Sequence, residues 1–277
     1  MGNKRRLTTL VTMITLLALL ALPFAAIAQT RVKPGINAFT IDDDIEFGRQ
    51  KAAEIERQVP LINDPLVQQW INHLGSRLAS NTGMPNLPWQ FQIINSSEIN
   101  AFALPGGFIF VNRGLIESTE DESEIIGALA HELAHVTLRH STNQITKQLM
   151  LLMPLAQLAN GHGRLGQIAK LGVIGMGLLF LKFSRGAERD ADILGVQTMV
   201  RAGYDPRGML AMFEKLQRGG PQFLSDHPNP ENRIERIRAE IALIGGPEDV
   251  VESSHLYFQV RSRLRSMPAA PRVTPGE

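Results

Sequence analysis

The pattern of apolar residues predicts two helices near the start of the chain. Across residues 43–57 and 64–79, apolar positions recur with the three- or four-residue spacing of a helix that has one buried face. Val67, Trp70 and Leu74 mark that face in the second segment. We expect the two helices to pack around the part of the chain that follows them.

The period changes between residues 85 and 112. Apolar and polar residues alternate from Trp89 to Ile93, and two short apolar runs, residues 101–104 and 108–111, are separated by a Pro-Gly-Gly turn. These features predict a small β-sheet.

The most clearly marked helix follows the predicted sheet. Thr119, with Glu122 three residues later, matches a capping box, and a helical apolar pattern then runs from Ile125 to about His140. Two apolar stretches come next, residues 149–158 and 168–181. The uncharged part of the second has only eleven residues, 171–181, which is too short to cross a bilayer. Residues 149–181 fit buried core helices, and they also fit a mobile lid or a peripheral membrane contact.

Helical patterns continue to Val200 and recur at residues 206–217 and 230–243. The proline-rich tail, residues 266–277, is expected to be disordered. We therefore predict one domain, residues 29–265, whose fold class is α+β and predominantly α.

The first 28 residues have the layout of a signal peptide. Basic residues at positions 4–6 precede an apolar run from Leu7 to about Leu22, and Ala26-Ile27-Ala28 supplies small residues for cleavage after Ala28. This predicts export, with the periplasm as the destination. An uncleaved N-terminal membrane anchor is the alternative.

Charge and cysteine content narrow the classes of function. Lys and Arg number 28 against 27 Asp and Glu, and removal of the three basic residues at positions 4–6 leaves 25 against 27. This near-neutral balance gives no sign of nucleic-acid binding. The chain has no cysteine, so any metal must be held by histidines and carboxylates.

His131, Glu132 and His135 form an HExxH sequence within the best-marked helix. Residues four apart on a helix lie one turn above each other, so the two imidazoles can bind one metal ion. Glu132, beside the ligands, suits a general base that takes a proton from water. A third ligand is needed, and the candidate is Glu188, which is one helical turn from Asp192. Taken alone, this charged run would fit a solvated helix face.

Together these motifs resemble peptidase family M48, a group of gluzincins. The similar segments are Asn100–Gly107, the HExxH sequence, Ser184-Arg185 with Glu188 and Asp192, and His227-Pro228 followed by Arg233. The resemblance implies a zincin-like fold with a small sheet beside the HExxH helix, and one Zn²⁺ per chain.

The family pattern also implies roles for single residues. Glu188 would be the third zinc ligand, and Asp192 would hydrogen-bond a ligand histidine. His227 would lie near the metal, either stabilising the oxyanion or plugging the open zinc position, but it also fits a histidine that caps a helix from Pro230. The strand Phe108, Ile109, Phe110 and Val111 is a candidate edge for an extended peptide substrate, although core packing explains its apolar residues equally well.

Four other histidines have no spacing or neighbours that favour a metal site, and we expect surface or structural roles for them: His73, His140, His162 and His255. Arg185 and Arg233 could pair with carboxylates of the site, but solvated side chains are the default expectation for both arginines.

The HExxH motif and its partners thus predict a zinc-dependent endopeptidase, and the resemblance to exported bacterial members of the family implies that it acts in the cell envelope on misfolded or misassembled polypeptides. The competing hypothesis is a zinc-containing holdase that binds polypeptides in the same cleft without hydrolysis.

Overall fold

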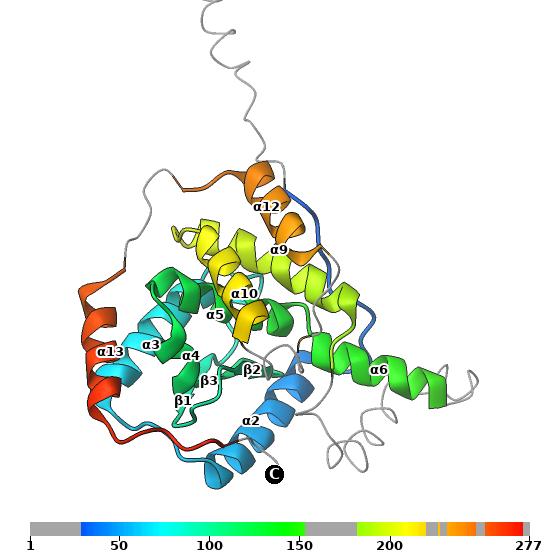
Figure 1. The fold of residues 1–277 in the computed structure, drawn as a ribbon. Helices are drawn as coiled ribbons and strands as arrows, with labels where there is room; N and C mark the ends of the chain where they lie inside the picture. Colours follow the sequence, from blue (N-terminus) through cyan, green and yellow to red (C-terminus); the bar gives the residue numbers. More distant parts are fainter. Residues whose placement is uncertain (1–28, 153–181, 220–226, 228–231, 248–252, 274–277) are drawn as a thin grey trace, which may run out of the picture.

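The computed structural model describes residues 29–152, 182–219, 227, 232–247 and 253–273 (Figure 1). The predicted signal peptide and most of the apolar region 149–181 therefore lie outside the described residues. The strands are β1 (Gln90–Ile94), β2 (Ala101–Leu104) and β3 (Phe108–Asn112). The helices are α2 (Ile41–Gln58), α3 (Pro65–Ala79), α4 (Arg113–Ser118), α5 (Glu122–Thr137), α6 (His140–Leu152), α9 (Arg185–Arg201), α10 (Arg207–Gly219), α12 (Arg233–Ile244) and α13 (His255–Ser266).

The three strands form one mixed sheet in the order β1-β3-β2. β1 runs parallel to β3, β2 runs antiparallel to it, and all five residues of β3 are buried. The expectation that Phe108–Val111 is an edge strand is therefore wrong, because β1 and β2 use the hydrogen-bonding groups on both its sides. Within the described residues, the strand with an unpaired edge next to α5 is β2.

Helix α5 is the centre of the molecule. It packs against α9 and α10 on one side and against β2 on another (Figure 1). Every residue of α5 except Ser123 is buried, so the face that carries the HExxH sequence is covered as well as the opposite face, which we expected to form the core. The enclosure follows from the small and apolar residues that lead up to the first histidine, residues 125–130, which allow close packing on all sides.

Both ends of α5 differ from the prediction. Asp121 is the N-cap, and its side chain accepts a hydrogen bond from the Ser123 backbone N–H at 2.7 Å. Thr119 instead follows the short helix α4, and its hydroxyl donates to the Ile116 carbonyl. The capping box assigned to Thr119 and Glu122 is therefore wrong. At the other end the helix stops at Thr137, because Arg139 adopts a left-handed conformation with φ 55°.

Hydrogen bonds attach the described residues at both ends of the chain to the rest of the domain. The Thr30 backbone N–H and hydroxyl donate to Glu240 of α12, and the Gln197 amide of α9 donates to the Thr30 carbonyl at 2.7 Å. At the other end, residues 267–273 have a defined path where we expected disorder. The Ser97 N–H donates to the Pro271 carbonyl at 2.8 Å, and the buried Arg113 guanidinium donates to the Pro268 carbonyl at 2.7 Å.

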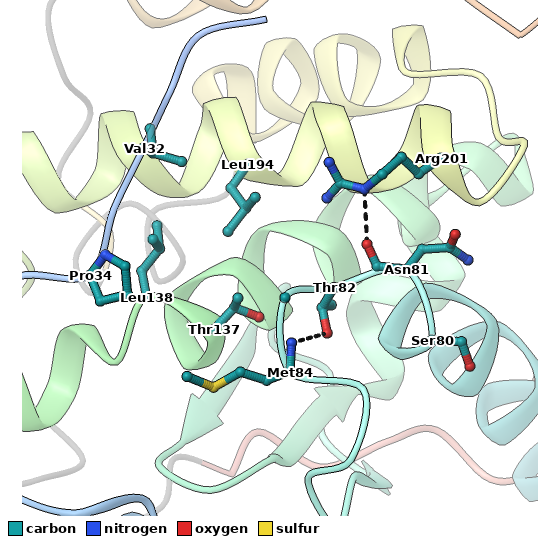
Figure 2. Close-up of a pocket in the computed structure, with 11 residues that line it drawn as sticks. Val32, Pro34, Ser80, Asn81, Thr82, Met84, Thr137, Leu138, Leu194 and Arg201 are labelled. Carbon is teal, nitrogen blue, oxygen red and sulfur yellow. Dashed lines mark hydrogen bonds between the residues drawn. The ribbon is translucent and has the colours of Figure 1, made fainter.

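A hollow of about 560 Å³ lies between the N-terminal segment, the loop after α3, the end of α5 and α9 (Figure 2). Leu138, Leu194 and Arg201 are among its lining residues, and none of the HExxH residues lines it. None of the helices in the described part of the chain has the length and hydropathy needed to cross a membrane.

Candidate metal centre

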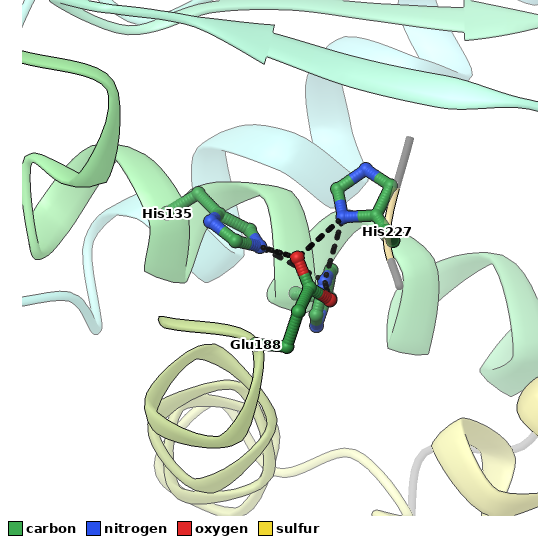
Figure 3. A group of neighbouring side chains, drawn as sticks. His135, Glu188 and His227 are labelled. Atoms are coloured by element: carbon green, nitrogen blue, oxygen red, sulfur yellow. Dashed lines mark hydrogen bonds and ion pairs between the residues drawn. The ribbon is translucent and has the colours of Figure 1, made fainter. Parts of the chain in front are cut away.

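Four buried side chains from three parts of the chain meet beside α5 (Figure 3). His131 and His135 are one turn apart on α5, Glu188 comes from the first turn of α9, and His227 comes from the segment between α10 and α12. The Ser184 hydroxyl caps α9 by accepting from the Ala187 N–H, which fixes where the turn that carries Glu188 begins.

The ligand atoms of these side chains are close together. The Nε2 atom of His131 lies 3.0 Å from His135 Nε2, 3.3 Å from Glu188 Oε2 and 3.3 Å from His227 Nδ1. Glu188 Oε1 lies 3.4 Å from His135 Nε2 and 3.1 Å from His227 Nδ1. The four side chains together surround one point in space.

These distances suit the ligands of one metal ion, and all four ligand atoms lie within 4.8 Å of one another. Bonds of about 2.0–2.1 Å place tetrahedral ligand atoms roughly 3.3–3.4 Å apart, close to the separations given above. Two or three imidazoles with one carboxylate are also a donor set that Zn²⁺ accepts in proteins. His131, His135, Glu188 and His227 could therefore hold a metal ion, and their chemistry fits zinc.

Glu132 lies beside this cluster, and its carboxylate contacts His227: Oε1 is 3.3 Å from His227 Nε2. This contact meets the distance of an ion pair but not the geometry of a hydrogen bond, and neither of the buried oxygens forms a hydrogen bond with the described residues. A buried carboxylate that is not held by a hydrogen bond is suited to proton transfer.

Asp192 and Arg233 contact His131 on its Nδ1 side. Asp192 Oδ1 lies 3.0 Å from His131 Nδ1, as expected for a residue that orients a ligand. Arg233 donates to the same oxygen from Nη2 at 2.6 Å, and its guanidinium lies over the Phe213 ring. Arg233 is buried, so the expectation of a solvated arginine is wrong. The pairing of charges with Asp192 makes that burial tolerable.

The charges of the cluster favour a positive charge at its centre. Burial lowers the pKa of His131, but hydrogen bonds with Asp192 and Glu188 outweigh it and raise that pKa to about 9. Burial raises the pKa of Glu188, yet the nearby His227 and His135 hold it well below its usual range. Burial also raises the pKa of Glu132. The carboxylates around His131 thus stabilise a cation here, which is what a metal ion supplies.

The remaining histidines divide into two groups. His73 and His255 are exposed, in line with the prediction, and His162 lies outside the described residues. His140 is buried, with Nδ1 3.0 Å from Nδ1 of His135, and Phe183 stacks on the His135 ring at 4.1 Å between centroids. The sequence did not single out either contact. On a continuous helix, five residues from His135 would place His140 on another face.

Comparisons with known proteins agree with this geometry. Residues 65–241 match the model of peptidase family M48. The chain is 32% identical over 261 residues to the beta-barrel assembly-enhancing protease of Escherichia coli, covering 88% of this chain and 53% of that protein. It is 31% identical over 207 residues to the mitochondrial metalloendopeptidase OMA1 of Schizosaccharomyces pombe, covering 71% and 59%.

A third relative is the metalloprotease YcaL of Escherichia coli, which is 30% identical over 179 residues, or 61% of this chain and 70% of that protein. The chain spans about half the length of the assembly-enhancing proteases that it matches. Since the family match covers more than half of the chain and includes the HExxH helix and Glu188, the chain belongs to peptidase family M48.

Proposed function

We propose that this chain is a zinc-dependent endopeptidase in which His131, His135 and Glu188 bind one Zn²⁺ and Glu132 is the general base. The observation that carries the proposal is a set of four buried ligand atoms within 4.8 Å of one another, next to a buried carboxylate that forms no hydrogen bond with the described residues. The membership of family M48 supports the same chemistry.

When bound, zinc is a Lewis acid that polarises the scissile carbonyl and lowers the pKa of water. Glu132 accepts a proton from the attacking water and later gives it to the nitrogen of the leaving amine. The raised pKa of Glu132, caused by burial, suits a carboxyl group that must hold a proton between these two events. Asp192 keeps the Nδ1 proton of His131 in place, so that Nε2 faces the metal.

His227 is proposed to be a reversible plug. A catalytic zinc site keeps one position open for water, yet His227 Nδ1 lies within tetrahedral ligand distance of both His131 and Glu188. His227 Nε2 also lies 3.3 Å from the general base Glu132. With His227 in this position, both the fourth ligand site and the base are engaged, so turnover requires the histidine to move away.

The substrate strand is proposed to be β2 rather than the buried strand β3. β2 is the edge strand beside α5, and a small recess is lined by Ala103 and Leu104 of β2 together with His135. An extended peptide can add to such an edge through main-chain hydrogen bonds. This arrangement would bring a scissile bond alongside the zinc ligands.

The physiological setting is proposed from the relatives and from the N-terminal sequence. A relative is named for assembly of β-barrels, and the signal peptide layout of residues 1–28 predicts export. We infer a periplasmic protease that cleaves misfolded or misassembled polypeptides, with no nucleic-acid partner. A peripheral membrane contact through residues 149–181 remains part of the proposal and lies largely outside the described residues.

The decisive experiment is digestion of unfolded casein with and without a metal chelator. The endopeptidase predicts chelator-sensitive cleavage, whereas the holdase predicts suppressed aggregation without cleavage. The Glu132→Gln variant should keep zinc and lose turnover, and wild-type digestion by this variant would contradict the mechanism. Glu188→Ala should lose zinc itself. His227→Ala should digest casein faster than wild type if His227 is a plug, and more slowly if it stabilises the oxyanion.

A further inference from the structure

The backbone breaks sharply between the metal-binding helix α5 and the next helix α6. Arg139 has a φ of 55°, a conformation that is uncommon for residues other than glycine. Its side chain is held from three directions: Nε donates to Asp44 Oδ2 at 2.6 Å, and Nη2 donates to the carbonyls of Phe39 and Thr40 at 2.7 and 2.8 Å. Asp44 is buried on α2, so the break is fastened to another part of the fold.

The break brings His140 back toward the metal centre. His140 is the first residue of α6 and is buried, and its Nδ1 lies 3.0 Å from Nδ1 of His135. The two rings meet edge to face, with centroids 4.9 Å apart and an interplanar angle of 74°. The 3.0 Å separation places the two Nδ1 atoms within hydrogen-bond distance of each other.

The chemistry of a ligand histidine decides the direction of this hydrogen bond. His135 turns Nε2 toward His131 and Glu188, so a metal there would bind Nε2 and leave the proton on Nδ1. That N–H needs an acceptor, and His140 Nδ1 is in place to accept it if His140 carries its own proton on Nε2. His131 has the anionic Asp192 in the equivalent position.

We propose that His140 is a positioning residue of the metal centre, which accepts the Nδ1–H hydrogen bond of His135 and fixes its tautomer and ring orientation. The Asp44–Arg139 pair holds the backbone break that places His140. This inference rests on the proposed zinc site. It assigns different acceptors to the two ligand histidines, a carboxylate for His131 and a neutral imidazole for His135.

The test measures zinc affinity in the full-length protein by competition with a chromophoric chelator. His140→Leu removes the acceptor and should weaken zinc binding by roughly 10- to 100-fold, as is typical when the partner of a ligand histidine is lost. His140→Asn keeps an acceptor oxygen near the place of Nδ1 and should stay within a few-fold of wild type. His73→Leu, the removal of an exposed histidine from α3, is the matched control and should change nothing.

A second pair of variants separates positioning from packing. His140→Gln carries the same amide as His140→Asn but displaces it by one methylene, so it should bind zinc less tightly than the Asn variant even where their melting temperatures in chelator agree. Asp44→Asn should also weaken zinc binding, although Asp44 contacts no metal ligand by hydrogen bond. If His140→Leu does not fold, the Asn and Gln pair decides.

The measurements distinguish failure of the proposed role of His140 from failure of the proposed zinc site. Zinc affinity within about twofold of wild type for His140→Leu, or equal affinity for the Asn and Gln variants, overturns the role of His140 while the zinc site stands. A wild-type protein that binds no zinc would overturn the proposed function itself.

Discussion

Two arginines of helix α12 each form an ion pair with a carboxylate on another helix. The two ion pairs have similar distances, but one is buried and the other is exposed to solvent. Arg233 lies 2.6 Å from Asp192 with side chains that are 1% and 3% exposed, whereas Arg238 lies 2.9 Å from Glu214 with side chains that are 60% and 39% exposed. From the distances alone, the two ion pairs would be expected to contribute equally to the free energy of unfolding. Burial predicts very different consequences when each arginine is replaced by methionine.

The Arg233→Met variant should lose about 3–5 kcal/mol of unfolding free energy, because the buried carboxylates of Asp192 and Glu188 would both lose their guanidinium partner. This loss of unfolding free energy includes the contribution of the guanidinium that lies over the Phe213 ring. The Arg238→Met variant should lose less than about 1 kcal/mol, because water screens both partners of the exposed pair.

Urea unfolding followed by circular dichroism measures both variants against wild type. Excess chelator in all samples keeps differences in metal binding out of the comparison. The double variant Arg233→Met/Asp192→Asn should recover part of the loss, because the charge of the Asp192 carboxylate is removed as well. If the two single variants differ by less than about 1 kcal/mol at equal m-values, burial does not determine the strength of these pairs and the reasoning is refuted.

Three further predictions concern parts of the fold away from the metal centre. Asp121→Ala should cost roughly 1 kcal/mol of stability through loss of the α5 N-cap, and an undiminished urea midpoint would contradict the assignment of that cap. The hydrogen bond from Arg263 holds the pKa of Asp64 below its ordinary value, so Asp64 stabilises the fold at neutral pH and this contribution is lost as the pH falls. The urea midpoints of wild type and Asp64→Asn should therefore keep their difference from pH 7 to about pH 5 and converge as the pH falls below about 4, and a constant difference would show that the carboxylate charge is not responsible. Truncation before residue 267 removes the Pro268 carbonyl from the buried Arg113 and should lower stability by roughly 1.5–3 kcal/mol, which a thermal melt of the truncated protein would detect.

Local sequence patterns predicted the sheet and the helices α2, α3, α5, α9, α10 and α12 because their signals are short-range, whereas α4 and α13 were not predicted. The HExxH spacing places two imidazoles on one helix face whatever surrounds it, and the alternation from Gln90 to Ile94 is intrinsic to a half-buried strand. The order of the strands is a long-range property. Apolar residues at 108–111 suit an edge beside a ligand as well as a central strand, so the pattern could not show that β3 is covered on both sides.

The parts of the site that the sequence missed or left open depend on tertiary contacts. The sequence could not decide whether Arg233 is solvated or pairs with a carboxylate of the site, because only the packing of α12 on α9 encloses it with Asp192. His140 belongs to the site only because Arg139 leaves the helical conformation, and the bonds that hold Arg139 come from residues about a hundred positions earlier. Helical periodicity cannot register an interruption that is caused by such a distant partner.

The fastening of Thr30 to α9 and α12 determines what removal of the apolar leader would do to the protein. Seven residues lie between Leu22 and Thr30, so the eight Cα–Cα steps that join them reach at most about 29 Å even when fully extended. This connecting segment is shorter than the roughly 45 Å diameter expected for a domain of this size. A chain that kept its leader in a bilayer would therefore turn the surface around α12 toward the lipid headgroups and meet its substrates in a thin layer next to the membrane. Cleavage after Ala28 would leave Gln29 alone ahead of the anchor point and would let the same domain search the whole compartment by diffusion.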